Sequence, residues 1–384
     1  MIKREVQGEL IKLAKQFKSV AVVGPRQSGK TTLTRYLFND KSYVNLENPD
    51  SRRFAINDPR GFLSQYSAGA VIDEAQRAPE LFSYLQQVLD EDNKKGKFIL
   101  TGSNNFLLQE TISQSLAGRI AYIYLVPFTL SELSVMSSTD LNSQMIKGSY
   151  PPVYDQDIGY DKWYPNYIRT YIERDVRQLK NITDLNVFER FLRLCAGRTG
   201  QLLNMNNLAL ETGVDSKTAG AWLSVLESSF ITFRLYQYHR NFNKRIVKMP
   251  KLYFYDTGLI CSLLGINTPD QLYLHPLYGS LFENLIVSEF KKLCFNRAKN
   301  ENLFFWRDNI GHEIDIIIEK RDGLFPVEVK SGKTITNDFF KGLNYWNTIS
   351  GIDGGSVVYS GDHIQKYSNN KKVIPWFMLT TLMD

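Results

Sequence analysis

The chain has 384 residues, a length that suits two or three domains. Of these residues 43% are hydrophobic and 22% are charged, the ordinary balance of a globular protein. No apolar run approaches the ~20 residues that a membrane span requires, and the N-terminus has no apolar secretion signal, so we expect a cytoplasmic protein without membrane segments. The three cysteines and four histidines are dispersed, which argues against a disulfide framework or a zinc centre.

The first motif lies at residues 20–32. Val20–Val23 predicts a buried parallel strand, Gly24–Thr31 fits the phosphate-binding pattern G-x-x-x-x-G-K-[ST], and Thr31–Phe38 has a helical pattern. Such a strand, loop and helix direct backbone N–H groups at a phosphate. Lys30 would reach the β- and γ-phosphates of ATP, and the Thr31 hydroxyl would join the shell of Mg²⁺. The predicted nucleotide-binding residues of this loop are Gly24, Pro25, Arg26, Gln27, Ser28, Gly29, Lys30, Thr31 and Thr32.

Residues 1–150 alternate apolar strand candidates with helical patterns, which predicts an α/β domain with a parallel sheet and helices on both faces. In such sheets ligands bind at the carboxyl ends of the strands. The expected strands are Val20–Val23, Tyr43–Leu46, Ala70–Ile72, Phe98–Thr101 and Ile120–Val126.

Polar residues follow two of these strands. Asp73 and Glu74 come directly after Ala70–Ile72, where Asp73 would hold Mg²⁺ and Glu74 would act as general base on the attacking water. Ser103 and Asn104 follow Phe98–Thr101, and either could position water near the γ-phosphate. A plain turn would also favour Ser and Asn here.

These signatures in this order resemble the AAA+ branch of P-loop ATPases. The segments 73–79, 100–103, 115–119 and 127–128 look like those of uncharacterised prokaryotic AAA-family ATPases that carry a C-terminal domain of unknown function. The resemblance covers most of the chain. It implies that Arg119 senses or stabilises the γ-phosphate, in cis or across a contact in a homo-oligomer, and a structural ion pair is the alternative.

The middle region, residues 151–260, resembles the lid of AAA+ proteins followed by a winged helix. Residues 163–179 carry an aromatic stripe at helical spacing, which is a core pattern first and a base-stacking platform second. Arg198 is a further candidate for sensing nucleotide. Between Tyr160 and Pro250, 14 Lys and Arg stand against 8 Asp and Glu, typical of a nucleic-acid footprint or of a solvated helical face.

Residues 207–227 predict a helix, a turn at Gly213 and a second helix from Ser216, the pattern of a helix-turn-helix. The segments 230–236 and 251–256 would form the wing strands, with the basic cluster between them at Arg240, Lys244, Arg245 and Lys248. Winged helices bind DNA or proteins, so both partners stay open.

Residues 261–384 resemble the PD-(D/E)xK nuclease superfamily. Asp315 lies on one strand of a predicted hairpin, and Glu328 and Lys330 share a face of the other. The resemblance implies that Glu283, Asp315 and Glu328 bind Mg²⁺ and that Lys330 positions the attacking water. Nuclease-like folds also occur as structural modules, so cleavage activity stays open.

The sequence therefore predicts an AAA+-type ATPase that binds ATP and Mg²⁺ and couples hydrolysis to action on DNA. The alternative is a nucleotide-controlled switch whose C-terminal domain binds protein and does not cleave DNA.

Overall fold

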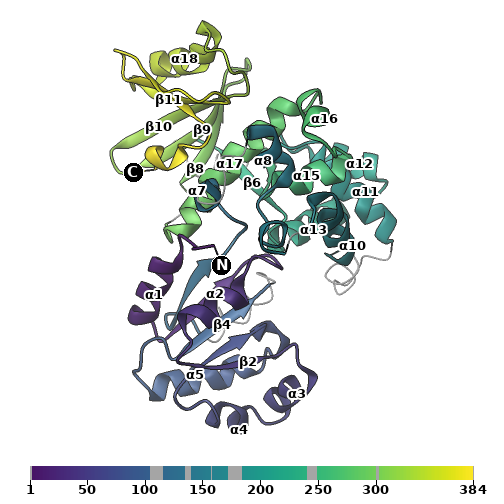
Figure 1. Cartoon of the computed structure of the whole chain (residues 1–384), viewed down its shortest axis with the longest axis vertical. Coiled ribbons are helices and arrows are strands. Elements are labelled where there is room, and N and C mark those ends of the chain that lie inside the picture. The colour runs from purple at the N-terminus through teal and green to yellow at the C-terminus, as the bar shows by residue number, and fades with distance from the viewer. Residues whose placement is uncertain are drawn as a thin grey trace. The chain divides into compact units, whose positions relative to one another are not determined.

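The computed structural model describes residues 2–103, 116–134, 140–156, 158–171, 184–239, 249–299 and 302–383 (Figure 1). The chain divides into two compact units. The N-terminal unit comprises Met1–Phe128 with two short returning segments, Ser228–Phe230 and Cys294–Asn300. Both segments belong to it because Tyr124 contacts Phe230 and Phe295 through their rings. The rest of the chain forms the C-terminal unit.

The N-terminal unit is built on a parallel sheet whose order, within the described residues, is β2-β3-β4-β1-β5. Helices flank this sheet (Figure 1), as the sequence predicts for an α/β fold. The strands are β1 (Ser19–Val23), β2 (Ser42–Asn45), β3 (Ala70–Asp73), β4 (Phe98–Gly102) and β5 (Ile120–Tyr124). The helices are α1 (Gln7–Gln16), α2 (Lys30–Leu37), α3 (Pro49–Asn57), α4 (Pro59–Ser64), the short 3₁₀ turn η1 (Ala75–Arg77) and α5 (Leu81–Glu91).

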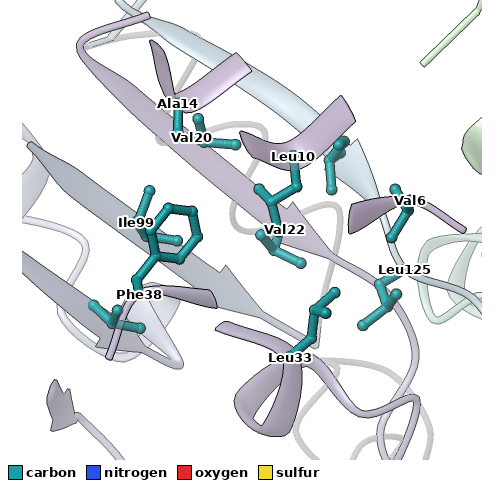
Figure 2. Close-up of a cluster of buried hydrophobic side chains, with 11 residues drawn as sticks. Val6, Leu10, Ala14, Val20, Val22, Leu33, Phe38, Ile99 and Leu125 are labelled. Atoms are coloured by element: carbon teal, nitrogen blue, oxygen red, sulfur yellow. The ribbon is translucent and has the colours of Figure 1, made fainter. Parts of the chain in front are cut away.

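A buried cluster joins α1 and α2 to the sheet (Figure 2). Leu10 and Ala14 are four residues apart, so they share one helix face, and Val20 and Val22 share one strand face. Leu33 of α2 packs into the same cluster. Because Leu10 and Val22 are fully buried, truncating either to alanine would cost about 2–5 kcal/mol for a leucine and somewhat less for a valine. The cluster therefore fixes the position of β1, and with it the start of the loop that follows β1.

The C-terminal unit contains a group of helices and a mixed sheet. Many of the helices begin at a side-chain cap, such as Asp184 before α11 and Asp256 before α15. The helices are α7 (Leu130–Ser134), α8 (Leu141–Lys147), α9 (Pro152–Asp155), α10 (Tyr160–Tyr171), α11 (Leu185–Ala196), α12 (Met205–Thr212), α13 (Ser216–Ser228), α15 (Thr257–Leu264), α16 (Pro269–Tyr273), α17 (Tyr278–Asn296), η3 (Asn337–Phe340), α18 (Lys341–Ser350) and η4 (Leu379–Leu382).

The mixed sheet of this unit runs, over the described residues, in the order β12-β13-β11-β10-β9-β8-β6-β7. Its strands are β6 (Thr232–Gln237), β7 (Lys251–Phe254), β8 (Leu303–Arg307), β9 (Glu313–Lys320), β10 (Gly323–Lys330), β11 (Gly355–Tyr359), β12 (Gln365–Lys366) and β13 (Lys371–Pro375). The antiparallel pair β6/β7, which we expect to be a wing, joins this sheet because β6 pairs in parallel with β8. One sheet therefore continues across residue 260, where the sequence analysis places a domain boundary.

The aromatic stripe of α10 is part of the core, the first of the two interpretations, as far as Tyr171. Trp163, Tyr167 and Tyr171 are buried and stack in series, with Trp163 also against Tyr150. The rest of the stripe, at residues 172–179, lies outside the described residues. Within the described part of the chain, no helix combines the length and the apolar character needed to cross a membrane.

Gly24 offers a test of how tightly β1 and β5 hold the loop. A Cβ at this position would collide with the carbonyl oxygen of Leu125, whereas one at the exposed Gly8 in α1 would meet nothing. We expect Gly24→Ala to lower the free energy of unfolding by about 1–3 kcal/mol, and Gly8→Ala to raise it by about 0.5–1 kcal/mol. Urea unfolding of both variants measures this, and equal stabilities would contradict the tight contact.

Candidate functional site

The phosphate-type loop follows β1, which is buried along its whole length. Gly29 lies in the left-handed region at φ +92° and is the residue from which α2 begins. Gln27 also has a positive φ, of 61°. The loop thus turns sharply twice before the helix, and the N-terminal N–H groups of α2 open toward it, the arrangement that binds phosphate. Pro25, Arg26 and Thr32 lie in the same loop or in the first turn of α2.

Several groups in the loop are placed to receive an anion. The Lys30 ammonium donates to the carbonyl oxygens of Gly24 at 2.9 Å and Pro25 at 2.7 Å, so it lies inside the loop. The Ser28 hydroxyl is buried and, among the described residues, its oxygen has no hydrogen-bond partner. A buried donor of this kind fits a phosphate oxygen, because leaving it unpaired costs free energy. The residues present therefore fit a nucleotide phosphate.

Arg4, which the sequence analysis did not single out, anchors this loop. It is only 4% exposed and donates to the carbonyl oxygens of Ser28 at 2.9 Å and Val126 at 2.7 Å. Its guanidinium also lies 4.7 Å from the ring centroid of Phe128. These partners are more than twenty residues away in the chain, so no local pattern could have indicated them.

Asp73, at the end of β3, is 3% exposed and accepts hydrogen bonds from three hydroxyl groups. Thr31 donates at 2.8 Å and Tyr43 at 2.6 Å, both to Oδ2, and Thr101 donates to Oδ1. Burial and the hydrogen bond to Asp73 raise the pKa of Tyr43, so it remains a donor. The structure thus brings together Thr31 and Asp73, the residues predicted to share a magnesium ion.

Glu74 lies beside this group in an uncommon backbone conformation, with φ +54°. Its N–H donates to the Thr101 hydroxyl at 3.2 Å, and its Oε2 accepts from Ser103 at 3.0 Å. Ser103 therefore orients Glu74, whereas we expected it to position water. Asn104, the other candidate at this strand end, lies outside the described residues.

Two arginines approach one carboxylate at the same edge of the sheet. Arg26 of the loop and Arg77 of η1 each have a guanidinium nitrogen 3.9 Å from Oε1 of Glu47. The Arg77 Nε is buried and has no hydrogen-bond partner among the described residues. Arg77 was not among the predicted site residues. Its position three residues after Glu74 was the available signal that it lies near the same strand end.

Arg119 lies at the opposite end of the strands, directly before the amino end of β5. Its carbonyl accepts from the N–H of Ser19 at the start of β1. The guanidinium pairs with Asp90, with Nε to Oδ1 at 2.6 Å and Nη2 to Oδ2 at 2.9 Å. The phosphate-type loop follows the carboxyl end of β1. Because β1 has five residues, its two ends are about 16 Å apart. The structure therefore does not bring Arg119 to its own loop, and a role across a subunit contact stays a prediction.

Arg198 belongs to the C-terminal unit, where its Nη2 pairs with Oε1 of Glu211 at 2.5 Å. In the same unit, α12, a left-handed Gly213 and α13 form the expected pair of helices. Asp215 precedes α13, and its carboxylate accepts from the backbone N–H groups of Lys217 and Thr218. The basic cluster Arg240, Lys244, Arg245 and Lys248 lies outside the described residues.

The C-terminal unit gathers four acidic side chains, which we call the carboxylate cluster: Glu283, Glu313, Asp315 and Glu328. Glu283, on α17, is bound by two groups of β7. Oε1 of Glu283 is 2.8 Å from the Lys251 ammonium and accepts from the Tyr253 hydroxyl at 2.5 Å. The same ammonium is 2.5 Å from Oε1 of Glu313. Burial lowers the pKa of Lys251, but Glu283, Asp315 and Glu313 outweigh it and hold that pKa above its ordinary value.

The other half of the cluster lies on β9 and β10. Asp315 accepts from the N–H of Val329 at 2.7 Å, and Glu328 Oε2 is 2.5 Å from the Lys330 ammonium. Burial and the negative charge of Asp315 raise the pKa of Glu328 to about 8. Its second oxygen, Oε1, faces Gly342, where a Cβ would collide with it, and has no partner among the described residues.

The three predicted magnesium ligands, Glu283, Asp315 and Glu328, therefore do not meet as a metal-ligand set. Among the described residues no group of three or more His, Cys, Asp or Glu is placed to hold a metal ion. The physical reason is that Glu283 turns to Lys251 and Tyr253, which the sequence analysis did not single out. Their i, i+2 spacing, which places them on one face of β7, was the available signal.

Comparison with known protein families matches three segments of the chain. Residues 16–134 match the family model of an AAA domain. Residues 138–270 and 278–379 match two domains of unknown function, DUF8612 and DUF4143. The N-terminal unit is thus an AAA-type P-loop ATPase domain, and the domain at the C-terminus has no assigned function.

Relatives found by sequence comparison are themselves described as uncharacterized proteins. Uncharacterized proteins of Mycobacterium tuberculosis and Mycobacterium bovis are each 29% identical over 378 residues, covering 97% of this chain and 83% of theirs. Among solved structures, a Walker-type ATPase of Pyrococcus abyssi is 16% identical and covers 69% of this chain and 96% of its own, with a TM-score of 0.47.

The hydroxyl group of Thr101 connects Asp73 to Glu74, which makes it a test of the site's internal support. Thr101→Val keeps the shape but removes a donor to a buried carboxylate, so we expect a loss of about 1–3 kcal/mol in the free energy of unfolding. The control Thr348→Val, on the exposed face of α18, should change it by less than about 0.5 kcal/mol. Thermal or urea unfolding measures both, and equal effects would remove Thr101 from this supporting role.

Proposed function

We propose that the N-terminal unit binds ATP with Mg²⁺ and hydrolyses it to ADP and phosphate. One observation carries this proposal: the buried Asp73 accepts from Thr31 while Glu74, next in the chain, is held by Thr101 and Ser103. Metal-binding and water-activating groups thus stand at the end of β3, directly beside the phosphate-type loop. ATPases of the P-loop class need these two functions in this place.

Each side chain has a distinct role. The loop N–H groups and Ser28 bind phosphate oxygens, and Lys30 exchanges its carbonyl partners for the β- and γ-phosphates. Thr31 and Asp73 hold the magnesium ion, which when bound neutralises charge on the phosphates. Glu74 takes a proton from the attacking water. The water oxygen bonds to the γ-phosphorus while the bond from that phosphorus to the β–γ bridging oxygen breaks, which releases ADP. Ser103 keeps the Glu74 carboxylate in one orientation.

Two substitutions separate binding from turnover. We expect Lys30→Ala to abolish ATP binding, because the ammonium is the main charge in the loop. Glu74→Gln should bind ATP as the unmodified protein does and lose about 10²- to 10⁴-fold in turnover, the usual contribution of a general base. Phosphate release and equilibrium binding of a fluorescent ATP analogue measure the two quantities.

The matched control for Glu74→Gln is Glu91→Gln, an exposed position of α5 in the same unit. It should leave both binding and turnover unchanged. Hydrolysis by Glu74→Gln at the rate of the control would remove Glu74 from its proposed role.

We infer further that the C-terminal unit is the output module and that it binds a partner protein without cutting DNA. The oxygens of Glu283 and Asp315 already accept from groups of the protein itself. In addition, the carboxylate of Asp215 stands at the start of α13, where a groove-binding helix would approach DNA phosphates. A negative charge there opposes such an approach.

Action on DNA is the second candidate function. The excess of Lys and Arg between Tyr160 and Pro250 favours it, because basic stretches neutralise phosphates. The two functions differ in whether nucleic acid is bound or cut.

Incubation with supercoiled and linear DNA, in Mg²⁺ with and without ATP, tests whether the protein cuts DNA. We expect the DNA to stay intact in every lane, and Lys330→Ala to behave as the unmodified protein. Nicking or linearisation that disappears in Lys330→Ala would establish DNA cleavage in place of the binding function. This assay is independent of the ATP measurements, so either half of the proposal can fail alone.

A further inference from the structure

The Lys251 ammonium lies among acidic groups from two directions. Its nitrogen is 2.8 Å from Glu283 on α17 and 2.5 Å from Glu313 on β9. The side chain is 4% exposed, compared with 18% for Glu283 and 22% for Glu313. The most enclosed member of the group is therefore the cation, and its two acidic partners lie around it.

The backbone fixes this ammonium in place. Lys251 begins β7, which pairs with β6 through Leu235, and it also bridges to Leu202. The neighbouring Leu252 accepts from Gly200, whose left-handed backbone passes beside the Glu283 carboxylate. A strand held on two sides fixes the backbone from which the Lys251 side chain, 4% exposed, extends into the cluster.

A magnesium ion does not fit this arrangement. It requires about six oxygen ligands at about 2.0–2.1 Å in near-octahedral geometry. Glu283, one of the predicted ligands, instead directs its Oε1 at the Lys251 nitrogen, which Oε1 of the neighbouring Glu313 also contacts. Bringing the ion in would place its two positive charges beside the buried ammonium of Lys251, at a cost that rises as solvent is excluded.

We propose that Lys251 is the built-in cation of the carboxylate cluster and takes the place of the divalent metal that the sequence resemblance to PD-(D/E)xK nucleases implies. The ammonium neutralises Glu283 and Glu313 and ties α17, β7 and β9 together without any bound ion. This deepens the non-cutting output proposed above by giving its physical reason. It makes no demand on the ATP site, and its test measures metal binding rather than cleavage.

Titration of the full-length protein with Mg²⁺ and then Mn²⁺, without nucleotide, tests the proposal. An Asp73→Asn background removes the other candidate metal ligand, so any uptake belongs to the C-terminal unit. Isothermal titration calorimetry and the melting temperature are the readouts. In this background the protein that retains Lys251, called the Lys251 protein below, should take up neither ion at millimolar concentration.

Lys251→Met in the same background should melt about 10 °C lower, because it leaves buried carboxylates without a counter-charge. Millimolar Mg²⁺ should bind and restore most of that loss. The matched variant Lys251→Met with Glu283→Gln should recover part of the loss without metal and gain nothing from Mg²⁺.

Three results would overturn the proposal. The first is Mg²⁺ uptake by the Lys251 protein that disappears when Asp315→Asn is added. The second is a folded Lys251→Met protein that takes up no ion. The third is a Lys251→Met protein that Mg²⁺ restores neither in melting temperature nor in soluble yield.

Discussion

The buried carboxylate of Asp73 is the constraint on which the N-terminal unit depends. A carboxylate withdrawn from water is stable only if donors surround it. Here the donors come from three elements, because Thr31 lies on α2, Tyr43 on β2 and Thr101 on β4. Satisfying this one group therefore aligns two neighbouring strands and the helix after the loop. The same alignment places Thr31 beside Asp73, as the proposed magnesium site would require, so stability and the proposed function impose the same geometry.

The C-terminal unit meets the same physical problem with a different solution. Its carboxylates accept from ammonium groups and a backbone N–H as well as from the Tyr253 hydroxyl, with Lys251 and Lys330 each held by acidic partners. Hydroxyl donors leave a carboxylate its full negative charge, which a divalent cation can still use. A buried ammonium neutralises that charge and fills the space. The buried ammonium of Lys251 thus distinguishes the carboxylate cluster from the metal site proposed at Asp73.

Backbone conformation contributes to the proposed ATP site along with side-chain chemistry. Glu74 is held at a positive φ, which costs a non-glycine residue about 1–3 kcal/mol unless its surroundings compensate. Thr101 and Ser103 supply that compensation through the Glu74 N–H and carboxylate. The strained turn is what directs the carboxylate of Glu74 to Ser103 while Asp73, one residue earlier, remains buried under the strand end.

The sequence by itself determined the parts of this protein that local order encodes. The apolar run before Gly24, the glycines of the loop and the acid pair after Ala70–Ile72 are each continuous in the chain, and they predicted the parallel sheet and the neighbourhood of Thr31, Asp73 and Glu74. Only the tertiary structure decided where Arg119 lies, because the direction and order of the strands determine at which end of the sheet a turn residue is placed. It also decided that Lys251 stands among Glu283 and Glu313, which lie 32 and 62 positions away. Charged side chains carry no periodic signal for such long-range pairs, so their partners follow from how strands and helices pack.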